Sequence, residues 1–167
     1  MKDVAKILSL VLILLLLLPV AKIDYEIEFW GQKAELKEYM NYFSVGLGLD
    51  QTMKFEMEGE TEKSKPKMSG SIIALIALIL IIAGAAFLNI FNTGDTKSTY
   101  IIMGIYAATF IFLLLLPMGV KNIKIDGESL KDGIGSEYVK MTIFYFISLL
   151  STLGILGIFA KEKFLGE

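Results

Sequence analysis

The sequence predicts an α-helical membrane protein: a four-transmembrane-helix bundle that carries a small antiparallel β-sheet formed by its two extracytoplasmic loops. Two observations lead to this fold class. First, 54% of the 167 residues are hydrophobic and the mean hydropathy is +0.62, values that are typical of membrane proteins. Second, four long apolar runs are separated by polar segments, and the longest polar segment alternates apolar and charged residues as a strand does. We therefore expect residues 1–167 to form a single tetraspan domain.

Each of the four apolar runs is long enough for a helix to cross a hydrocarbon core of ~30 Å. They must be helical because no backbone group can stay unpaired in lipid. The first run also fits a signal peptide, but Pro19 stands where a cleavage site needs a small residue, so we expect a retained helix. The predicted transmembrane segments are 4–20, 68–91, 100–120 and 141–160, and the external loops are 21–67 and 121–140.

The first external loop contains three predicted strands. Segments 23–29, 43–49 and 53–58 alternate apolar and polar residues, and a period of two places the apolar set on one face of a sheet. The polar residues 50–52 then read as the turn of a hairpin between the second and third strands.

The remaining loop segments show other patterns. Good helix formers at 33–40 predict a short surface helix, and the charged segment 56–67 predicts a solvated connector. In the second loop, 121–127 alternates again. If both loops lie on one side of the membrane, this candidate strand can extend the sheet.

The composition excludes several kinds of chemistry. The chain has no Cys, no His and no Arg, which removes thiolate nucleophiles, disulfides, imidazole bases and guanidinium clamps. The transmembrane segments 68–91, 100–120 and 141–160 hold no ionisable residue other than tyrosine, although transport sites usually need one. The net charge of −2 with mixed signs gives no nucleic-acid footprint. We expect no enzyme activity, no catalytic residue, no cofactor and no metal.

Two acidic patterns need separate comment. The segment 46–50 resembles the GxGD motif of intramembrane aspartyl proteases, but Asp50 comes one residue late and has no partner Asp in a membrane helix. Acids at every second position could hold Ca²⁺ through oxygen ligands, but lysines follow at once, so we favour a solvated strand edge. These acids are Glu56, Glu58, Glu60 and Glu62.

Small residues recur at close spacing on the predicted helices. Gly104 and Ala108 lie four apart on the third helix, and Gly154 and Gly157 lie three apart on the fourth. Small residues let helix backbones approach each other in lipid. They serve either packing inside the bundle or a lateral interface with another chain. Trp30, the only Trp, either anchors at the headgroups or covers the apolar face of the sheet.

This order of elements resembles the claudin and peripheral myelin protein superfamily. The first-loop signature of that family is a Trp, then Gly-Leu-Trp, then two cysteines. Trp30 matches the first Trp, and Gly48 and Leu49 match the Gly-Leu, whereas Asp50 replaces the second Trp and the cysteines are absent. The resemblance implies an outward sheet on a left-handed bundle that binds a partner or another copy laterally.

We therefore expect a non-enzymatic integral membrane protein that acts as a structural or interaction module. It would self-associate or serve as an accessory subunit, with the lipid bilayer and another membrane protein as its partners. The alternative is a small transporter or pore. We expect a multi-pass protein of the plasma membrane with cytoplasmic termini. The excess of lysines in the external loops favours the opposite orientation, but folded loops translocate with less regard to charge.

Overall fold

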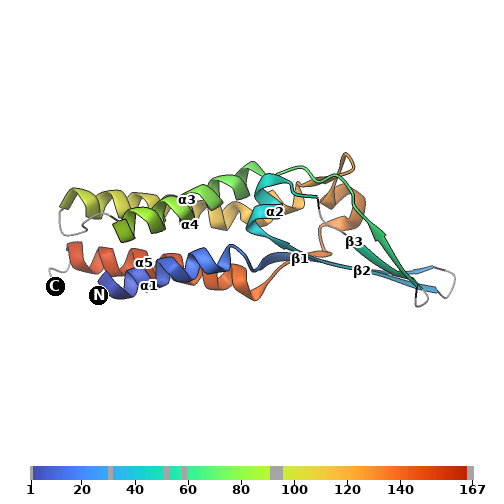
Figure 1. The fold of residues 1–167 in the computed structure, drawn as a ribbon, viewed down its shortest axis with the longest axis horizontal. Helices are drawn as coiled ribbons and strands as arrows, with labels where there is room; N and C mark the ends of the chain where they lie inside the picture. The colour runs from blue at the N-terminus through green and yellow to red at the C-terminus, as the bar shows by residue number, and fades with distance from the viewer. Residues whose placement is uncertain (1, 30–31, 51–52, 58–59, 91–95, 165–167) are drawn as a thin grey trace.

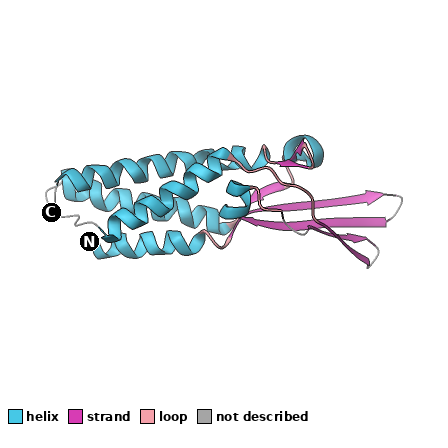
Figure 2. Cartoon of the chain, turned by 45° about the horizontal axis from the view of Figure 1, so that its top comes forward, coloured by secondary structure: helices cyan, strands magenta, loops and turns pink. Residues whose placement is uncertain are grey.

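The computed structural model describes residues 2–29, 32–50, 53–57, 60–90 and 96–164. It has a bundle of long helices at one end and a β-sheet that projects from the other end (Figures 1 and 2). The first helix begins and the last helix ends at the end of the bundle away from the sheet (Figure 1). We call the sheet, with the short elements around it, the cap.

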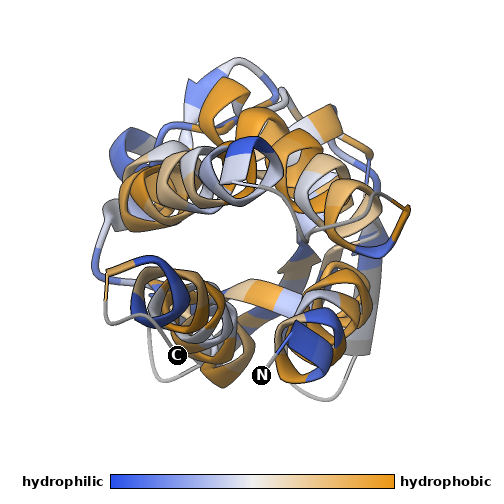
Figure 3. Ribbon diagram, turned by 90° about the vertical axis from the view of Figure 1, so that its left-hand side faces the viewer, coloured by the Kyte–Doolittle hydropathy of each residue, from blue (hydrophilic) through white to orange (hydrophobic). Residues whose placement is uncertain are grey.

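Four helices pack as a ring in which each one contacts two neighbours (Figure 3). The order around the ring is α1, α3, α4 and α5, and the successive helices α3 and α4 are antiparallel neighbours. The helices α3, α4 and α5 are long and apolar enough to cross a membrane, so the prediction of a multi-pass membrane protein is supported for these three segments. The bounds are Lys2–Leu15 for α1, Ile72–Ile90 for α3, Thr96–Lys121 for α4 and Ile143–Phe164 for α5.

The first helix is shorter than the predicted segment 4–20. At 1.5 Å per residue, the 14 residues of α1 cover roughly 21 Å. Leu16, Leu17 and Leu18 form tight turns, since each backbone N–H donates to the carbonyl three residues before it. Pro19 then opens a strand, and a proline disfavours helical backbone in the residue before it. The chain therefore passes directly from the bundle into the sheet.

The sheet has five antiparallel strands in the order β4-β3-β2-β1-β7. The second loop contributes β7, which pairs with the start of β1 through Ala21–Met141 and Ile23–Val139. The second loop therefore extends the sheet, but through β7 and not through the predicted strand 121–127. The bounds are Pro19–Phe29 for β1, Gln32–Asn41 for β2, Met53–Met57 for β3, Glu60–Ser64 for β4 and Val139–Met141 for β7.

The predicted strand at 121–127 is not the one that joins the sheet. Only Lys124–Ile125 is extended, as β5, and it pairs with β6 (Glu128–Ser129) in a separate hairpin. A short π-helical turn, η1 (Lys131–Gly135), follows and leads to β7. The α4 helix runs on to Lys121, the first residue that the alternation assigned to the strand.

Two further predictions for the first loop are wrong. Residues 33–40, predicted as a helix, form most of β2, because pairing with β1 along its whole length outweighs a weak helix propensity. Residues 43–49, predicted as a strand, are mostly the helix α2 (Tyr42–Leu47). The expected hairpin with 53–58 is therefore absent, and β3 pairs with β2 and with β4 instead. The strand β4 occupies part of the predicted connector.

Both ends of α2 are capped. The Asn41 side chain accepts a hydrogen bond from the Ser44 backbone N–H at 2.9 Å. Gly48 lies in the left-handed region with φ 66°, and its N–H donates to the Ser44 carbonyl at 3.0 Å. Asparagine before a helix and glycine after it are the residues that these positions favour.

The helix α2 joins the cap to the bundle through backbone contacts. The Ser71 N–H donates to the Val45 carbonyl at 2.8 Å. A Cβ atom on Gly70 would lie 2.5 Å from the Gly46 carbonyl oxygen, and one on Gly48 would overlap the Gly70 nitrogen. Only glycine permits this approach between α2 and the segment that enters α3.

We predict that Gly48→Ala destabilises the protein strongly. The substitution adds left-handed strain and a collision with backbone, which together cost on the order of 3 kcal/mol. Thermal unfolding in detergent measures the loss. Gly127→Ala is the matched control, because Gly127 also has positive φ, at 96°, but has open space around it. If the two variants lose equal thermal stability, the close backbone contact at Gly48 contributes nothing to the stability of the fold.

Candidate functional site

The residues that the sequence marks for interaction lie in separate places. Trp30 lies outside the described residues. Gly48 and Leu49 follow α2 at the base of the cap, whereas the other four lie on the bundle. The four are Gly104 and Ala108 on α4, and Gly154 and Gly157 on α5. No single site unites the six that the structure describes.

The segment after α2 has a structural role in joining the cap to the bundle. Gly48 makes the backbone contact described above, and the Leu49 side chain is 51% exposed. The Asp50 carboxylate accepts a hydrogen bond from the Met68 N–H at 3.1 Å. Asp50 therefore ties the first loop to the chain that enters α3.

Glycines on the bundle helices face in two directions. Gly84 faces inward, and a Cβ atom on it would lie 3.1 Å from Cζ of Tyr106. Gly154 touches α1, since its Cβ position lies 3.0 Å from Leu8. Gly104 and Gly157 are exposed, with nothing within 4 Å of the Cβ position. Packing inside the bundle therefore explains Gly84 and Gly154. It does not explain Gly104 and Gly157, which lie on the outer surface.

On α4 the exposed glycine lies among large side chains. Tyr100 and Ile101, one turn before Gly104, are 53% and 48% exposed. Ile111, one turn beyond Ala108, is 55% exposed. Gly104 and Ala108 thus form a low strip between apolar ridges, which we call the α4 strip. A second helix can approach a backbone closely at such a place.

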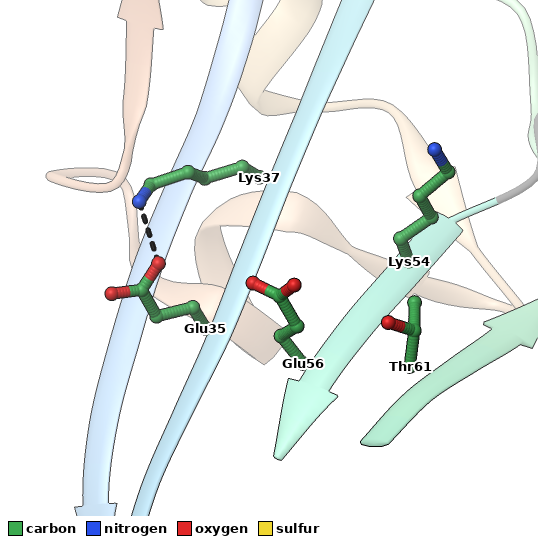
Figure 4. Close-up of a pocket in the computed structure, with 5 residues that line it drawn as sticks. All are labelled: Glu35, Lys37, Lys54, Glu56 and Thr61. Atoms are coloured by element: carbon green, nitrogen blue, oxygen red, sulfur yellow. Dashed lines mark hydrogen bonds and ion pairs between the residues drawn. The ribbon is translucent and has the colours of Figure 1, made fainter. Parts of the chain in front are cut away.

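The outer face of the sheet carries charges of both signs. A shallow hollow of about 140 Å³ opens on it, and Figure 4 shows its lining side chains on β2, β3 and β4. The Lys37 ammonium binds the Glu35 carboxylate at 2.6 Å. Because positive and negative groups are interspersed, this face has no strong preference for a ligand of one sign. The lining residues are Glu35, Lys37, Lys54, Glu56 and Thr61.

On the same face, a group of three charges joins the two loops. Asp24 on β1 binds Lys22 at 2.9 Å and lies 3.7 Å from Lys140 on β7. The hydrogen bond from Lys22 is the main cause that lowers the pKa of Asp24; burial opposes it, and the charges of Lys22 and Lys140 add to it. The group is exposed, so salt screens it.

The inner face of the sheet is mainly apolar, although Glu38 lies on it opposite Ile23, and it borders a second hollow of about 190 Å³. The turn between β5 and β6 closes one side of it. Asp126 in this turn has φ 49°, and its carboxylate accepts from the Lys67 N–H at 2.9 Å. The rings of Tyr25 and Tyr138 pack edge to face, and their centroids lie 4.7 Å apart. The hollow is lined by Tyr25, Leu36, Met53, Ser64, Pro66, Ile125, Asp126 and Ile134.

No family model, curated protein or solved structure matches this chain. The resemblance to the claudin superfamily therefore stays a prediction. Within the described ranges, no three acidic side chains lie close enough to hold a metal ion. Glu58, one of the four alternating acids, lies outside those ranges, and Glu56 is exposed on β3 opposite Thr61.

We predict that Asp24→Asn lowers the melting temperature at neutral pH. The folded state lowers the pKa of Asp24, so its charge stabilises the protein above the unfolded pKa of about 3.9, and this contribution is lost as the pH falls through the folded value. The difference in melting temperature between the wild type and the variant should therefore be largest above about pH 4 and should disappear at lower pH. Thermal scans from pH 7 to pH 2 at low salt measure it, and a gap that does not change with pH would contradict the ion pairs.

Proposed function

We propose that this protein is a non-enzymatic tetraspan membrane protein that associates laterally, with other copies or as an accessory subunit of another membrane protein. The α4 strip and the cap are the proposed contact surfaces. The observation that carries the proposal is the outward position of Gly104. The bundle leaves open a small-residue strip that helix packing in lipid would fill.

The proposal makes α1 the fourth span. The helix packs against α3 and α5, which are long and apolar enough to cross a membrane. From Ile7 onward its exposed side chains are all apolar, as contact with lipid requires, and the charged residues Lys2, Asp3 and Lys6 lie in its first turns. With the three turn residues that follow, and a bilayer that thins locally, a short span is tolerated. The outward residues of α1 and the following turn include Val4, Ile7, Leu10, Leu14 and Leu17, which are 52%, 60%, 54%, 63% and 66% exposed.

We predict that Gly104→Leu reduces lateral association several-fold without lowering thermal stability. The added side chain fills the α4 strip, and its Cβ atom would have nothing within 4 Å. Crosslinking in native membranes, and counting of subunits in nanodiscs, measure association. Ala86→Leu is the control, because Ala86 is an exposed small residue on α3. Unchanged association of the Gly104 variant, or equal loss in both variants, would refute the α4 strip as the contact.

We further propose that the protein lies in the plasma membrane with the cap outside and both termini in the cytoplasm. The support is the position of the cap, which lies at one end of the bundle, with the outer ends of α1 and α5 at the other (Figure 1). A folded sheet built from two long loops suits an external face, where it can meet other proteins.

The orientation can be measured with single cysteines, since the chain has none of its own. We expect Lys140→Cys, on the sheet, to react with an impermeant thiol reagent in intact cells. Lys161→Cys, at the far end of α5, should react only after lysis. The reverse pattern would place the cap inside the cell.

A second function, a small pore or transporter, is favoured by one observation. Hydroxyl side chains from three helices are buried inside the bundle, where a polar lumen would need them. We predict that if these groups line a pore, proteoliposomes that have shrunk in hyperosmotic glycerol will re-swell faster than vesicles without protein, because glycerol then enters through the pore. Rates equal to those of protein-free vesicles would exclude a pore for this solute class. Among the described residues of these three helices, the buried hydroxyl residues are Ser9 on α1, Thr99, Tyr106 and Thr109 on α4, and Tyr145, Ser148, Ser151 and Thr152 on α5.

A further inference from the structure

The base of the cap contains a segment without charged residues. Residues 42–49, which are α2 and the two residues after it, hold no ionisable side chain other than tyrosine. The rest of the first loop is rich in lysines and acids, and Asp50 follows the segment directly. Within the segment, Leu47 and Leu49 are 52% and 51% exposed. An apolar patch on a charged surface generally marks a contact with a protein or a membrane.

The depth of α2 follows from its contacts with α3. A Cβ atom on Gly46 would lie 3.2 Å from the backbone nitrogen of Leu75, and the Ser71 N–H donates to the Val45 carbonyl. The 19 residues of α3 make it about 28 Å long, close to the ~30 Å of a hydrocarbon core. To cross the core, α3 must use its full length, so its first turn lies at the membrane boundary. Because α2 packs against that turn, it lies at the same depth.

Exposed apolar side chains also lie at the cap end of each long helix. In each case the next charged residue towards the cap is a lysine, and a lysine just beyond an apolar surface is typical of a membrane boundary. Leu47 and Leu49 therefore continue a surface that the helices present to lipid. The helix-end residues are Leu17 in the turn after α1, Ile72 on α3, Met118 on α4 and Ile143 on α5, which are 66%, 73%, 61% and 64% exposed. The lysines are Lys22, Lys67, Lys121 and Lys140.

The backbone of α2 is suited to surroundings with little water. The Ser44 N–H donates to the Asn41 side chain, and the Ser44 carbonyl accepts the N–H groups of Gly48 and Leu49 at 3.0 and 3.3 Å. The Val45 carbonyl accepts the bond from the start of α3. A short helix in water can leave its end groups to the solvent, whereas a helix at a lipid boundary needs partners for them within the protein.

We propose that residues 42–49 form a lipid-binding surface, in which Leu47 and Leu49 lie among the acyl chains of the leaflet at the cap end. Because this surface continues the lipid-facing sides of the helices, its occupant is a phospholipid of the bilayer. The base of the cap is thus an interfacial element that holds the sheet at the membrane surface. The proposal is independent of lateral association through the α4 strip, and it holds for either orientation of the cap.

Spin labels on Leu47→Cys and Leu49→Cys, in phosphatidylcholine nanodiscs that hold one chain each, test the proposal. Power saturation compares collisions of the label with oxygen, which dissolves in lipid, and with a water-soluble nickel chelate. We expect an oxygen-to-nickel ratio several-fold above that of Lys124→Cys on β5 and approaching that of Leu114→Cys on α4, since both control residues are exposed. A ratio equal to that of Lys124→Cys, or low collision rates with both reagents, would overturn the proposal.

A crosslinking experiment in native membranes identifies the occupant directly. Photoreactive benzoylphenylalanine in place of Leu47 should form adducts of phospholipid mass, whereas the same group in place of Lys124 should not. Crosslinks from position 47 to a second copy or to another protein, without lipid adducts, would overturn the proposal. Since the Leu47 side chain is 52% exposed, its replacement should leave the melting temperature nearly unchanged.

Discussion

The backbone contact between α2 and the chain entering α3 fixes the cap on the bundle. Glycines at 46, 48 and 70 remove every side chain from the contact, so main chain meets main chain. The Val45 carbonyl and the Asp50 carboxylate then accept the N–H groups of Ser71 and Met68. These are the groups that precede a helix and would otherwise stay unpaired near the membrane boundary. The position of the sheet relative to the bundle follows from this contact.

The sequence was most informative where one physical factor dominated. The long uncharged runs of α3, α4 and α5 permit no other structure in lipid, and the alternation at 23–29 places Ile23 and Tyr25 on the apolar face of β1. The predictions failed where two signals competed. Residues 33–40 favour a helix locally, but the neighbouring strand supplies hydrogen bonds along their whole length. For α2, the capping residues Asn41 and Gly48 outweighed a chance alternation.

The sequence predicts which small residues lie on the helices, but it does not predict which of them face outward, and the reason is geometric. In the sequence Gly84 looks the same as Gly104, since each is a small residue in a long apolar run. Which of them faces a neighbour depends on the rotation of each helix about its axis, and that rotation is set by contacts across the ring. The same rotation buries Tyr106 at 0% exposure while Tyr100, on the same helix, is 53% exposed. No spacing rule within one segment contains this information.

The pairing of β1 with β7 joins the beginning of the chain to the residues just before its final helix. During synthesis β1 emerges early, yet its partner along Ala21–Ile23 is made only after α3 and α4. Until then that edge of β1 has no β7 beside it, and the ring of helices lacks α5, which packs against both α1 and α4. Arrival of the last segment therefore completes the sheet and the ring of helices together, so a nascent chain truncated before β7 would lack both the β1–β7 pairing and the contacts of α5.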